Sequence, residues 1–450
     1  MTASHSSAAL HSSAAPHCRP ARPLSLRLWL ALFACAALLG ACGGVNNDRT
    51  KAHVRLVNAA DAAGYPALDL HMEGTLRQGG VAYGQTGTYF DVEPDEADST
   101  ISNAGSPTAL LTFTPALARN RSYTLLAFGG IGALRQLLVE ESVPEPTANR
   151  TALRVINAAP DAGDLDVYVT ADGDALETSV PARAGAKYGE TSAVLDVASG
   201  TWRVRVAAAN SKTDLRLDLR EVVFGDRGAL TLVLTPSRGG TLVNAIVLVQ
   251  GGGVTRLDNA QARVRVLAGV TDSGAVTASA GGTPLMEGIG SPAAGAYVLL
   301  SAGTPPLAIS VNGNSVAAPS PVLAAGGDYT VLVYGALAAP QAALIEDNNR
   351  LPTVSGTVRI RLVNAAAGLS GPLSMTVDAL PVAGNVAAGT ASSPYVTADA
   401  NEAAAISVAA AGTTTPVFSA TAQRLTAGGV YSVFVVGAAG ATSGILRKDR

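Results

Sequence analysis

The sequence predicts an all-β protein built as four tandem, immunoglobulin-like, antiparallel β-sandwich domains, with small β-barrels as the alternative. Three observations predict this: the composition, a repeat of about 100 residues, and strand-like alternation inside each repeat. Of 450 residues, 48% are hydrophobic and only 14% are charged, with 48 Gly and 24 Pro. This balance can fill a packed core, and it is too poor in charge for a coiled coil and too poor in Gly for collagen.

Two phrases recur in order along the chain at intervals of about 100 residues. The opening phrase is VRLVNAADA at 54–62, LRVINAAPDA at 153–162, the degraded VRVLAGVTD at 264–272, and IRLVNAAAG at 360–368. The closing phrase is SYTLLAFGG from Ser122, ALTLVLTPS from Ala229, DYTVLVYGA from Asp328, and VYSVFVVGA from Val430. Units of this length are too long for solenoid repeats, so each copy is expected to have its own core.

Within a copy the hydrophobic period is two. Trp202, Val204 and Val206 alternate with Arg203 and Arg205. Successive side chains of a strand point to opposite faces, so such a segment buries one face and exposes the other. Seven or eight short strands of this kind in about 100 residues favour a two-sheet sandwich. Trp202 is accordingly expected in the core.

Stretches rich in Pro, Gly and Asn separate the copies. They give the predicted organisation: a signal peptide at 1–41, a tether at 42–52, and repeats at 53–146, 151–250, 260–349 and 356–450. The linkers are short, so a jointed chain of domains is expected.

The N-terminal segment has the features of a secretory signal. Three arginines precede an apolar run from Leu28 to Ala41 that is short for a membrane-spanning helix. Its end, Leu39-Gly40-Ala41-Cys42, resembles the bacterial lipobox. The resemblance implies that Cys42 is the lipidated first residue of the mature chain, and that Gly43 favours the outer over the inner membrane. An ordinary signal peptide is the alternative.

A second resemblance covers nearly all of residues 53–450. The segment LRVINAAPDAGDLDVYV at 153–169 is similar to the start of the bacterial domain-of-unknown-function family numbered 4397, and Tyr329 and Tyr431 match its closing strand. Copy one lacks the Pro, copy two has Leu230 in place of the closing Tyr, and copy three has lost Asn-Ala-Ala. The family implies exported, repeated β domains and no assigned activity.

The mature chain carries few side chains suited to catalysis. Its only histidines are His53 and His71, and Cys42 is its only cysteine. The sequence has no G-x-S-x-G elbow, H-E-x-x-H motif or P-loop, and AFGGIGAL at 127–134 is interpreted as a hairpin turn. His71 is expected at a solvent-facing strand position. No enzyme activity and no cofactor are therefore predicted.

A cluster of aspartates is the one weak candidate for a metal site. The cluster comprises Asp161, Asp164, Asp166, Asp172 and Asp174. Calcium prefers several oxygen ligands on a flexible loop, but the EF-hand spacing is absent, so solvated turns are the favoured interpretation. The recurring Asp61 and Asp161 are interpreted as turn caps, and Tyr123, Tyr329 and Tyr431 as buried structural rings at strand entry.

The composition also bounds the partners. The net charge of −3 argues against nucleic acid. The function expected is a non-enzymatic cell-envelope lipoprotein that serves as a structural, spacer or protein-interaction module. The alternative is a surface receptor that binds a polysaccharide or another ligand through loops at domain ends. The expected partners are the membrane, through the lipid on Cys42, and an envelope protein or glycan.

Overall fold

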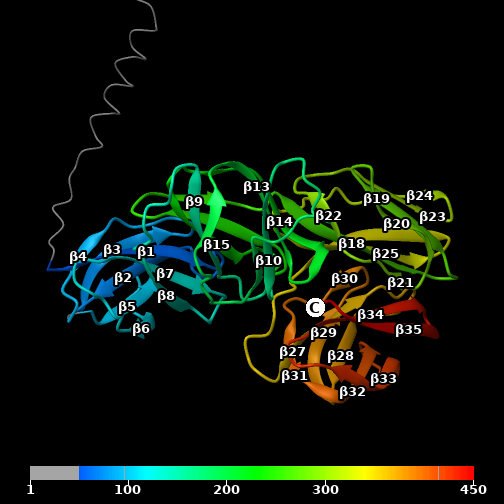
Figure 1. The fold of residues 1–450 in the computed structure, drawn as a ribbon. Coiled ribbons are helices and arrows are strands. Elements are labelled where there is room, and N and C mark those ends of the chain that lie inside the picture. Colours follow the sequence, from blue (N-terminus) through cyan, green and yellow to red (C-terminus); the bar gives the residue numbers. More distant parts are fainter. Residues whose placement is uncertain (1–49, 96, 414) are drawn as a thin grey trace, which may run out of the picture. The chain divides into compact units, whose positions relative to one another are not determined.

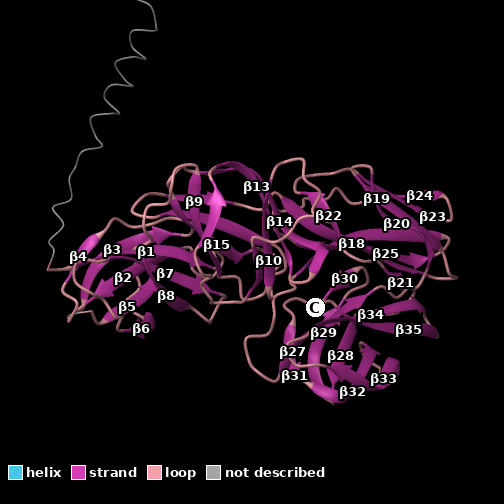
Figure 2. Cartoon of the chain, in the orientation of Figure 1, coloured by secondary structure: helices cyan, strands magenta, loops and turns pink. Residues whose placement is uncertain are grey.

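The computed structural model describes residues 50–95, 97–413 and 415–450 (Figure 1). These residues contain strands, turns and loops and no helix, as the uniformly magenta elements of Figure 2 show. Consequently, the described part of the chain holds no helix of the length and hydrophobicity needed to cross a membrane. The predicted signal peptide and Cys42 lie outside the described residues.

The strands fall into four successive sandwiches. Sandwich 1 contains β1 (Ala52–Ala60), β2 (Ala67–Met72), β3 (Thr75–Ala82), β4 (Phe90–Val92), β5 (Ser99–Asn103), β6 (Ala109–Phe113), β7 (Ser122–Gly129) and β8 (Arg135–Glu140). Sandwich 2 contains β9 (Arg150–Asn157), β10 (Leu165–Thr170), β11 (Arg183–Ala186), β12 (Leu195–Ala198), β13 (Gly200–Ala208), β14 (Ser211–Phe224), β15 (Ala229–Pro236), β16 (Val243–Val249) and β17 (Val254–Leu257).

The second half of the chain repeats the pattern. Sandwich 3 contains β18 (Gln261–Val270), β19 (Ala275–Ala280), β20 (Thr283–Gly290), β21 (Ala293–Ala294), β22 (Val298–Ser301), β23 (Leu307–Val311), β24 (Asn314–Val316), β25 (Asp328–Ala336) and β26 (Ala339–Asp347). Sandwich 4 contains β27 (Thr357–Asn364), β28 (Leu373–Val377), β29 (Leu380–Val386), β30 (Thr390–Ala391), β31 (Val396–Asp399), β32 (Asn401–Ala410), β33 (Pro416–Leu425), β34 (Val430–Ala438) and β35 (Ala441–Lys448).

Each sandwich consists of two sheets with the same order of main strands, and sandwich 2 has β17 as an additional edge strand. One sheet, here called the opening sheet, holds the opening strand beside the closing strand, in the order β4-β1-β7-β8 in sandwich 1. The other sheet has the order β3-β2-β5-β6. The two sheets are separate and open-edged, so the predicted sandwich is confirmed and the barrel alternative is not formed.

The expectation of purely antiparallel sheets is wrong at one strand pair in each sandwich. The opening and closing strands run parallel: β1 with β7, β9 with β15, β18 with β25, and β27 with β34. The long intervening chain returns to the same sheet from the opposite end, which a parallel pair requires. The two recurring phrases of the sequence are thus direct neighbours in space.

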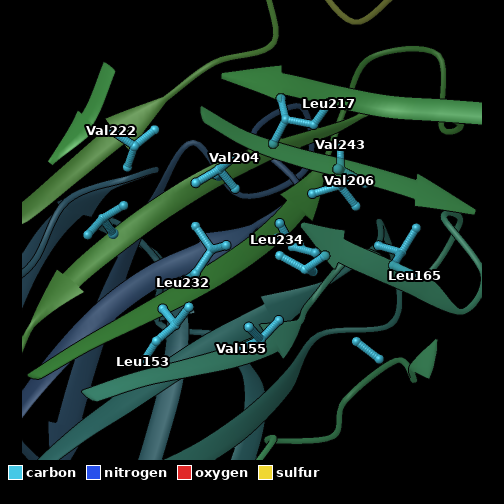
Figure 3. Close-up of a cluster of buried hydrophobic side chains, with 14 of the residues drawn as sticks. Leu153, Val155, Leu165, Val204, Val206, Leu217, Val222, Leu232, Leu234 and Val243 are labelled. Atoms are coloured by element: carbon cyan, nitrogen blue, oxygen red, sulfur yellow. The ribbon is translucent and has the colours of Figure 1, made fainter. Parts of the chain in front are cut away.

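Every sandwich has a core of its own. In sandwich 2, Leu153, Val155 and Leu232 from the opening sheet meet Val204 and Val206 from the facing sheet (Figure 3). Trp202 packs at the edge of this core, and its indole N–H donates to the Ala198 carbonyl at 2.9 Å. The strand alternation therefore assigned the core face correctly.

The closing-strand tyrosines have the structural role that their recurrence predicted. Tyr123, Tyr329 and Tyr431 are each at most 4% exposed. In each case the hydroxyl accepts a hydrogen bond from the backbone N–H five residues upstream, at 3.1, 2.8 and 2.8 Å. This is the arrangement called a tyrosine corner in Greek-key sandwiches. Sandwich 2, with Leu230 at this position, lacks it.

Candidate functional site

An arginine occupies the same position on all four opening strands, on the face turned away from the core. It lies opposite a hydroxyl residue of the parallel closing strand in every copy. The register pairs are Arg55 with Thr124, Arg154 with Thr231, Arg265 with Thr330, and Arg361 with Ser432. Arg265 and Arg361 are among the largest fully buried side chains of the described chain. Buried arginines require acidic or carbonyl partners.

Sandwiches 3 and 4 provide these partners to each other. Arg265 of sandwich 3 lies 2.5 Å from Asp449 of sandwich 4, and Arg361 of sandwich 4 is ion-paired with Asp347 of sandwich 3. Each acid also accepts a hydrogen bond from the hydroxyl of its own closing strand, Asp347 from Thr330 and Asp449 from Ser432, both at 2.6 Å. Such a reciprocal exchange of equivalent residues is the signature of a twofold-like interface.

Apolar side chains surround this ionic centre. Leu267 and Leu332 of sandwich 3 cluster with Val363, Phe434 and Val436 of sandwich 4. The two opening sheets thus pack on each other through the faces opposite their cores.

The paired charges hold each other ionised. Burial alone raises the pKa of Asp347, but Arg361 and Arg265 outweigh it, so its pKa is lowered. Burial lowers the pKa of Arg265, yet Tyr297, Asp347 and Asp449 together raise it. The cluster therefore keeps its carboxylate and its guanidinium charged throughout the neutral range.

A tyrosine stacks on the arginine in three of the copies. The guanidinium carbons lie 4.7, 4.7 and 4.6 Å from the ring centroids in the pairs Arg55–Tyr89, Arg265–Tyr297 and Arg361–Tyr395. Tyr89 and Tyr297 also donate to the acid of their own sandwich, Glu141 and Asp347, at 2.6 Å. Desolvation and Asp347 raise the pKa of Tyr297, so this hydroxyl remains a donor.

Sandwiches 1 and 2 are paired in the same way with a weaker ionic centre. Arg55 binds Glu141 of its own sandwich at 2.9 Å and reaches the carbonyls of Val249 and Gly252 in sandwich 2. Arg154 returns to the Glu140 carbonyl of sandwich 1 at 2.9 Å. Sandwich 2 has Gln250 where the other copies have the acid. The arginine of each sandwich therefore donates to backbone carbonyl groups of the other sandwich and not to its carboxylate.

Residues 348–356 join β26 to β27 and are here called the 3–4 linker; the loops at the ends of sandwiches 1 and 2 contact it. Asp61 is ion-paired with Arg350, and Asp161 accepts the Leu351 backbone N–H at 2.8 Å. The recurring aspartate of the opening phrase therefore binds the same linker from two different sandwiches. Asp61 also accepts the Ala63 N–H at 2.9 Å, so it is the turn cap that was predicted. The turn-cap prediction is wrong for Asp161, because within the described chain its carboxylate accepts the distant Leu351 N–H and no N–H of its own turn.

A cavity of about 470 Å³ opens beside this contact, and it is the candidate ligand site. Its walls come from the β7–β8 turn, the β9–β10 loop, Tyr188, the 3–4 linker, and Arg359 with Thr397 of sandwich 4. Cavities of this size at domain junctions are where small ligands most often bind.

Positive charge dominates the cavity. Arg135, Arg350 and Arg359 line it together with a single carboxylate, Asp161. Arg350 is compensated by Asp61, whereas Arg135 stacks on Tyr188 at 5.3 Å and Arg359 donates to Arg350 and Asn348 oxygens. Among the described residues, neither Arg135 nor Arg359 forms an ion pair with a carboxylate.

Burial shifts the charged groups around the cavity in opposite senses. It raises the pKa of Asp161, against the Leu351 hydrogen bond and the charges of Arg350 and Arg450. Burial also lowers the pKa of Arg359, and it lowers that of Arg450 to about 10. An anion placed beside the guanidinium groups would offset their desolvation.

The weak calcium candidates are not gathered into a site. The described residues contain no group of three or more His, Cys, Asp or Glu side chains placed to share a metal ion. The expectation of solvated turns is wrong for Asp161 and Asp166, which are both 6% exposed. Asp166 accepts the backbone N–H groups of Gly185 and Asn210, because the loops beside β10 bring unpaired donors to its strand.

The other three aspartates of that cluster are exposed. Asp172 pairs with Arg220 at 2.7 Å, and Asp174 accepts the Ala171 N–H at 3.0 Å. Asp164 accepts a backbone hydrogen bond through its carbonyl from Ala209. These three aspartates therefore make three separate sets of contacts, whereas a calcium site needs several oxygen ligands directed at one point.

The two histidines have separate surroundings. His53 is buried, and its Nδ1 lies 2.6 Å from an Asp91 oxygen. Its Nε2 is buried with no hydrogen-bond partner among the described residues. His71 is half-buried on β2.

Sequence reasoning missed the recurring arginine and its acidic partners. The arginine stands in all four opening phrases, so its repetition was a readable signal. The acids at the ends of the last strands, Glu141, Asp347 and Asp449, recur as well, but only the structure shows that they meet the arginine. The cavity combines side chains from six separate places in the chain and left no local signal.

The fold and the paired sheets define a multi-sandwich β protein. A family model described as Domain of unknown function (DUF4397) matches residues 52–168 and 262–371. These segments make up just over half of the chain, and the chain belongs to this family. Each match covers one sandwich and continues into the opening strand of the next, so it includes the arginines of a pair, Arg55 with Arg154 or Arg265 with Arg361. No curated protein matches the chain.

Proposed function

We propose that this chain is a non-enzymatic cell-envelope lipoprotein that serves as a structural and protein-interaction module. The observation that carries the proposal is the use of the recurring charged residues. Two buried ion pairs connect sandwiches 3 and 4: Arg265 with Asp449, and Arg361 with Asp347. Groups that recur in the copies thus support assembly of the chain, and they are not displayed around a substrate.

The anchor belongs to the same proposal. The lipobox-like sequence places acyl chains on Cys42, and two or more chains hold a protein stably at a membrane. Palmitate labelling and membrane sedimentation of wild type and Cys42→Ala test the anchor. Wild type is expected in the membrane fraction and the variant in the soluble fraction. A variant that still sediments with membranes contradicts the lipid anchor.

Pairing through sheet faces favours an interaction module over an extended spacer. A spacer is best served by domains joined end to end, whereas here the faces of two opening sheets are covered in each pair. Small-angle scattering of the purified chain tests this point. A maximum dimension near that of four domains in line, about 150 Å from four domains of roughly 35–40 Å, supports the spacer role and contradicts this preference.

A second candidate function is a receptor for a polysaccharide or another ligand. The cavity supports it, because the β7–β8 turn and the β9–β10 loop at the ends of two sandwiches form part of its walls, and binding residues are often placed on such loops. A glycan array probed with the purified chain separates the two candidates. Retention of a glycan favours the receptor, and retention of none leaves the structural module.

A further inference from the structure

We propose that the cavity beside the 3–4 linker binds the carboxylate of an acidic saccharide, with Arg135 and Arg359 as its anion-binding residues. The inference rests on the receptor role named above and specifies its ligand. Three properties of the cavity carry it: charge without a partner, neutral hydrogen-bonding groups, and size.

Two guanidinium groups of the cavity, those of Arg135 and Arg359, form no ion pair with a carboxylate in the described part of the chain. The Arg135 guanidinium carbon lies 5.7 Å from the Phe128 ring and 5.3 Å from the Tyr188 ring, and the side chain also hydrogen-bonds to Tyr188. A guanidinium has five N–H donors along its edge, so a stacked arginine that uses one of them for a neighbouring hydroxyl keeps others for an anion. Arg359 uses Nη1 for carbonyl and amide oxygens of Asn348 and Arg350.

Asp161 offsets only part of this charge: it raises the pKa of Arg359, but burial outweighs it and the pKa stays lowered. Its Oδ1 accepts the Leu351 N–H, and its pKa is raised by burial. Asp61 is committed to Arg350. A planar carboxylate is the natural complement of an arginine edge, because two parallel N–H···O bonds can form.

The remaining wall suits a sugar ring. Asn348, Thr353 and Thr397 bring amide and hydroxyl groups to the cavity, and Pro160 and Leu351 bring apolar surface. Sugars present hydroxyl groups at their edges and C–H groups on their faces, so they need both kinds of contact. A volume of about 470 Å³ lies in the lower part of the range for small-ligand sites, and it suits one or two rings better than a polypeptide segment.

The test uses the full-length chain in detergent and isothermal titration. The probes are a trimer of galacturonic acid and its neutral galactose counterpart. The expected result is that the acidic trimer binds at least about tenfold more tightly than the neutral one, and that Arg135→Gln removes at least about tenfold of this affinity. Arg135→Lys is expected to recover part of the loss. Arg119→Gln is the matched control, because Arg119 is an exposed arginine that contacts Asp95 outside the cavity.

Arg359→Gln is the second variant, and it is expected to weaken the acidic trimer to a similar extent. Arg359 is half-buried, so the unfolding temperature of the Arg359→Gln variant is measured alongside its affinity. Arg135 is exposed, so a loss of affinity in Arg135→Gln reports on binding and not on folding. Equal affinity for the two trimers, or unchanged affinity in Arg135→Gln, overturns the inference.

Three further outcomes distinguish this inference from the receptor role itself. Retention of only neutral glycans on the array overturns the acidic ligand and leaves the receptor standing. Binding of an acidic peptide with displacement by no saccharide overturns the ligand class. Failure of a panel of uronic acid oligomers and of every arrayed glycan overturns both the inference and the receptor role.

Discussion

Arg265 of sandwich 3 and Asp449 of sandwich 4 lie 2.5 Å apart, with both side chains at most 1% exposed. The equivalent arginine of sandwich 4, Arg361, makes the reverse contact with Asp347. Two copies of one domain in one chain have therefore adopted the geometry of a symmetric dimer. The interface depends on an acid at the end of the last strand of each partner.

Removing one acid from this centre is expected to be costly. Asp347→Asn leaves Arg361 buried without its carboxylate, and breaking a buried ion pair costs about 3–5 kcal/mol. Urea unfolding of wild type and variant measures the difference. Asp172→Asn is the control, because the exposed Asp172–Arg220 pair is worth at most about 1 kcal/mol. Equal losses in the two variants contradict the importance of the buried centre.

Acid is expected to weaken the same interface. The pKa of Asp347 in the folded chain is lowered, so its ionisation contributes stability that is complete above its unfolded pKa of about 3.9. That stability is lost as the pH falls below this value and through the folded pKa. Unfolding free energies at pH 6 and at lower pH values measure the slope. The slope is expected to be smaller in Asp347→Asn, and an identical slope in the variant contradicts the assignment to Asp347.

Gly269 lets the opening sheets of sandwiches 3 and 4 pack closely, because it has no side chain at their interface. A Cβ on Gly269 of β18 would lie 3.1 Å from the Ala365 Cβ and 3.2 Å from a Val436 methyl group across the 3–4 interface. Gly269→Val is expected to separate the sheets locally and to lower stability by about 1–3 kcal/mol through overpacking. Hydrogen exchange of β27 and β34 should increase. Gly384→Val is the matched control, because Gly384 is an exposed glycine of β29 with only an ordinary contact at 3.9 Å.

The tyrosine corners allow a smaller and more local test. Tyr329→Phe removes the hydroxyl that accepts the Ala324 N–H at 2.8 Å, so a loss of about 1 kcal/mol is expected. Tyr334→Phe is the control, because the hydroxyl of Tyr334 binds the exposed side chain of Gln341. Thermal unfolding of both variants provides the measurement. A loss in Tyr334→Phe as large as that in Tyr329→Phe contradicts the role assigned to the corner.

The fold was largely predictable because its signals are local. Alternation assigned Val204 and Val206 to the core, and recurrence singled out Tyr329 as a structural ring. The parallel pairing of opening and closing strands was not predictable, since periodicity does not give strand direction. Strand alternation assigns the face opposite the core to solvent, but Val57 and Leu267 on that face are apolar. They pack against a neighbouring sandwich, so these residues were the sequence signal of the interface.

The candidate site was far less predictable. Its aspartates were visible, and the recurrence of Asp61 and Asp161 was interpreted as a turn cap, which is confirmed for Asp61 and wrong for Asp161. Their common partner is the linker at Arg350 and Leu351, which lies 289 residues from Asp61 and 190 from Asp161. Nothing in a single sequence couples positions so far apart, because the contact depends on how whole sandwiches pack.

The hydrogen bond between Asp161 and the Leu351 N–H is expected to hold the 3–4 linker in place. The carboxylate of Asp161 is the acceptor for the Leu351 N–H, so Asp161→Ala removes that hydrogen bond and leaves the linker held by Arg350 and Asp61. Hydrogen exchange at Leu351 is expected to become about tenfold faster, which corresponds to a loss of about 1.4 kcal/mol of local protection. Asp164→Ala is the matched control, because Asp164 is an exposed aspartate of the same loop whose side chain contacts no linker residue among those described. Unchanged exchange at Leu351 in Asp161→Ala shows that other contacts hold the linker. Asp161 would then have no role in positioning the linker beside the cavity.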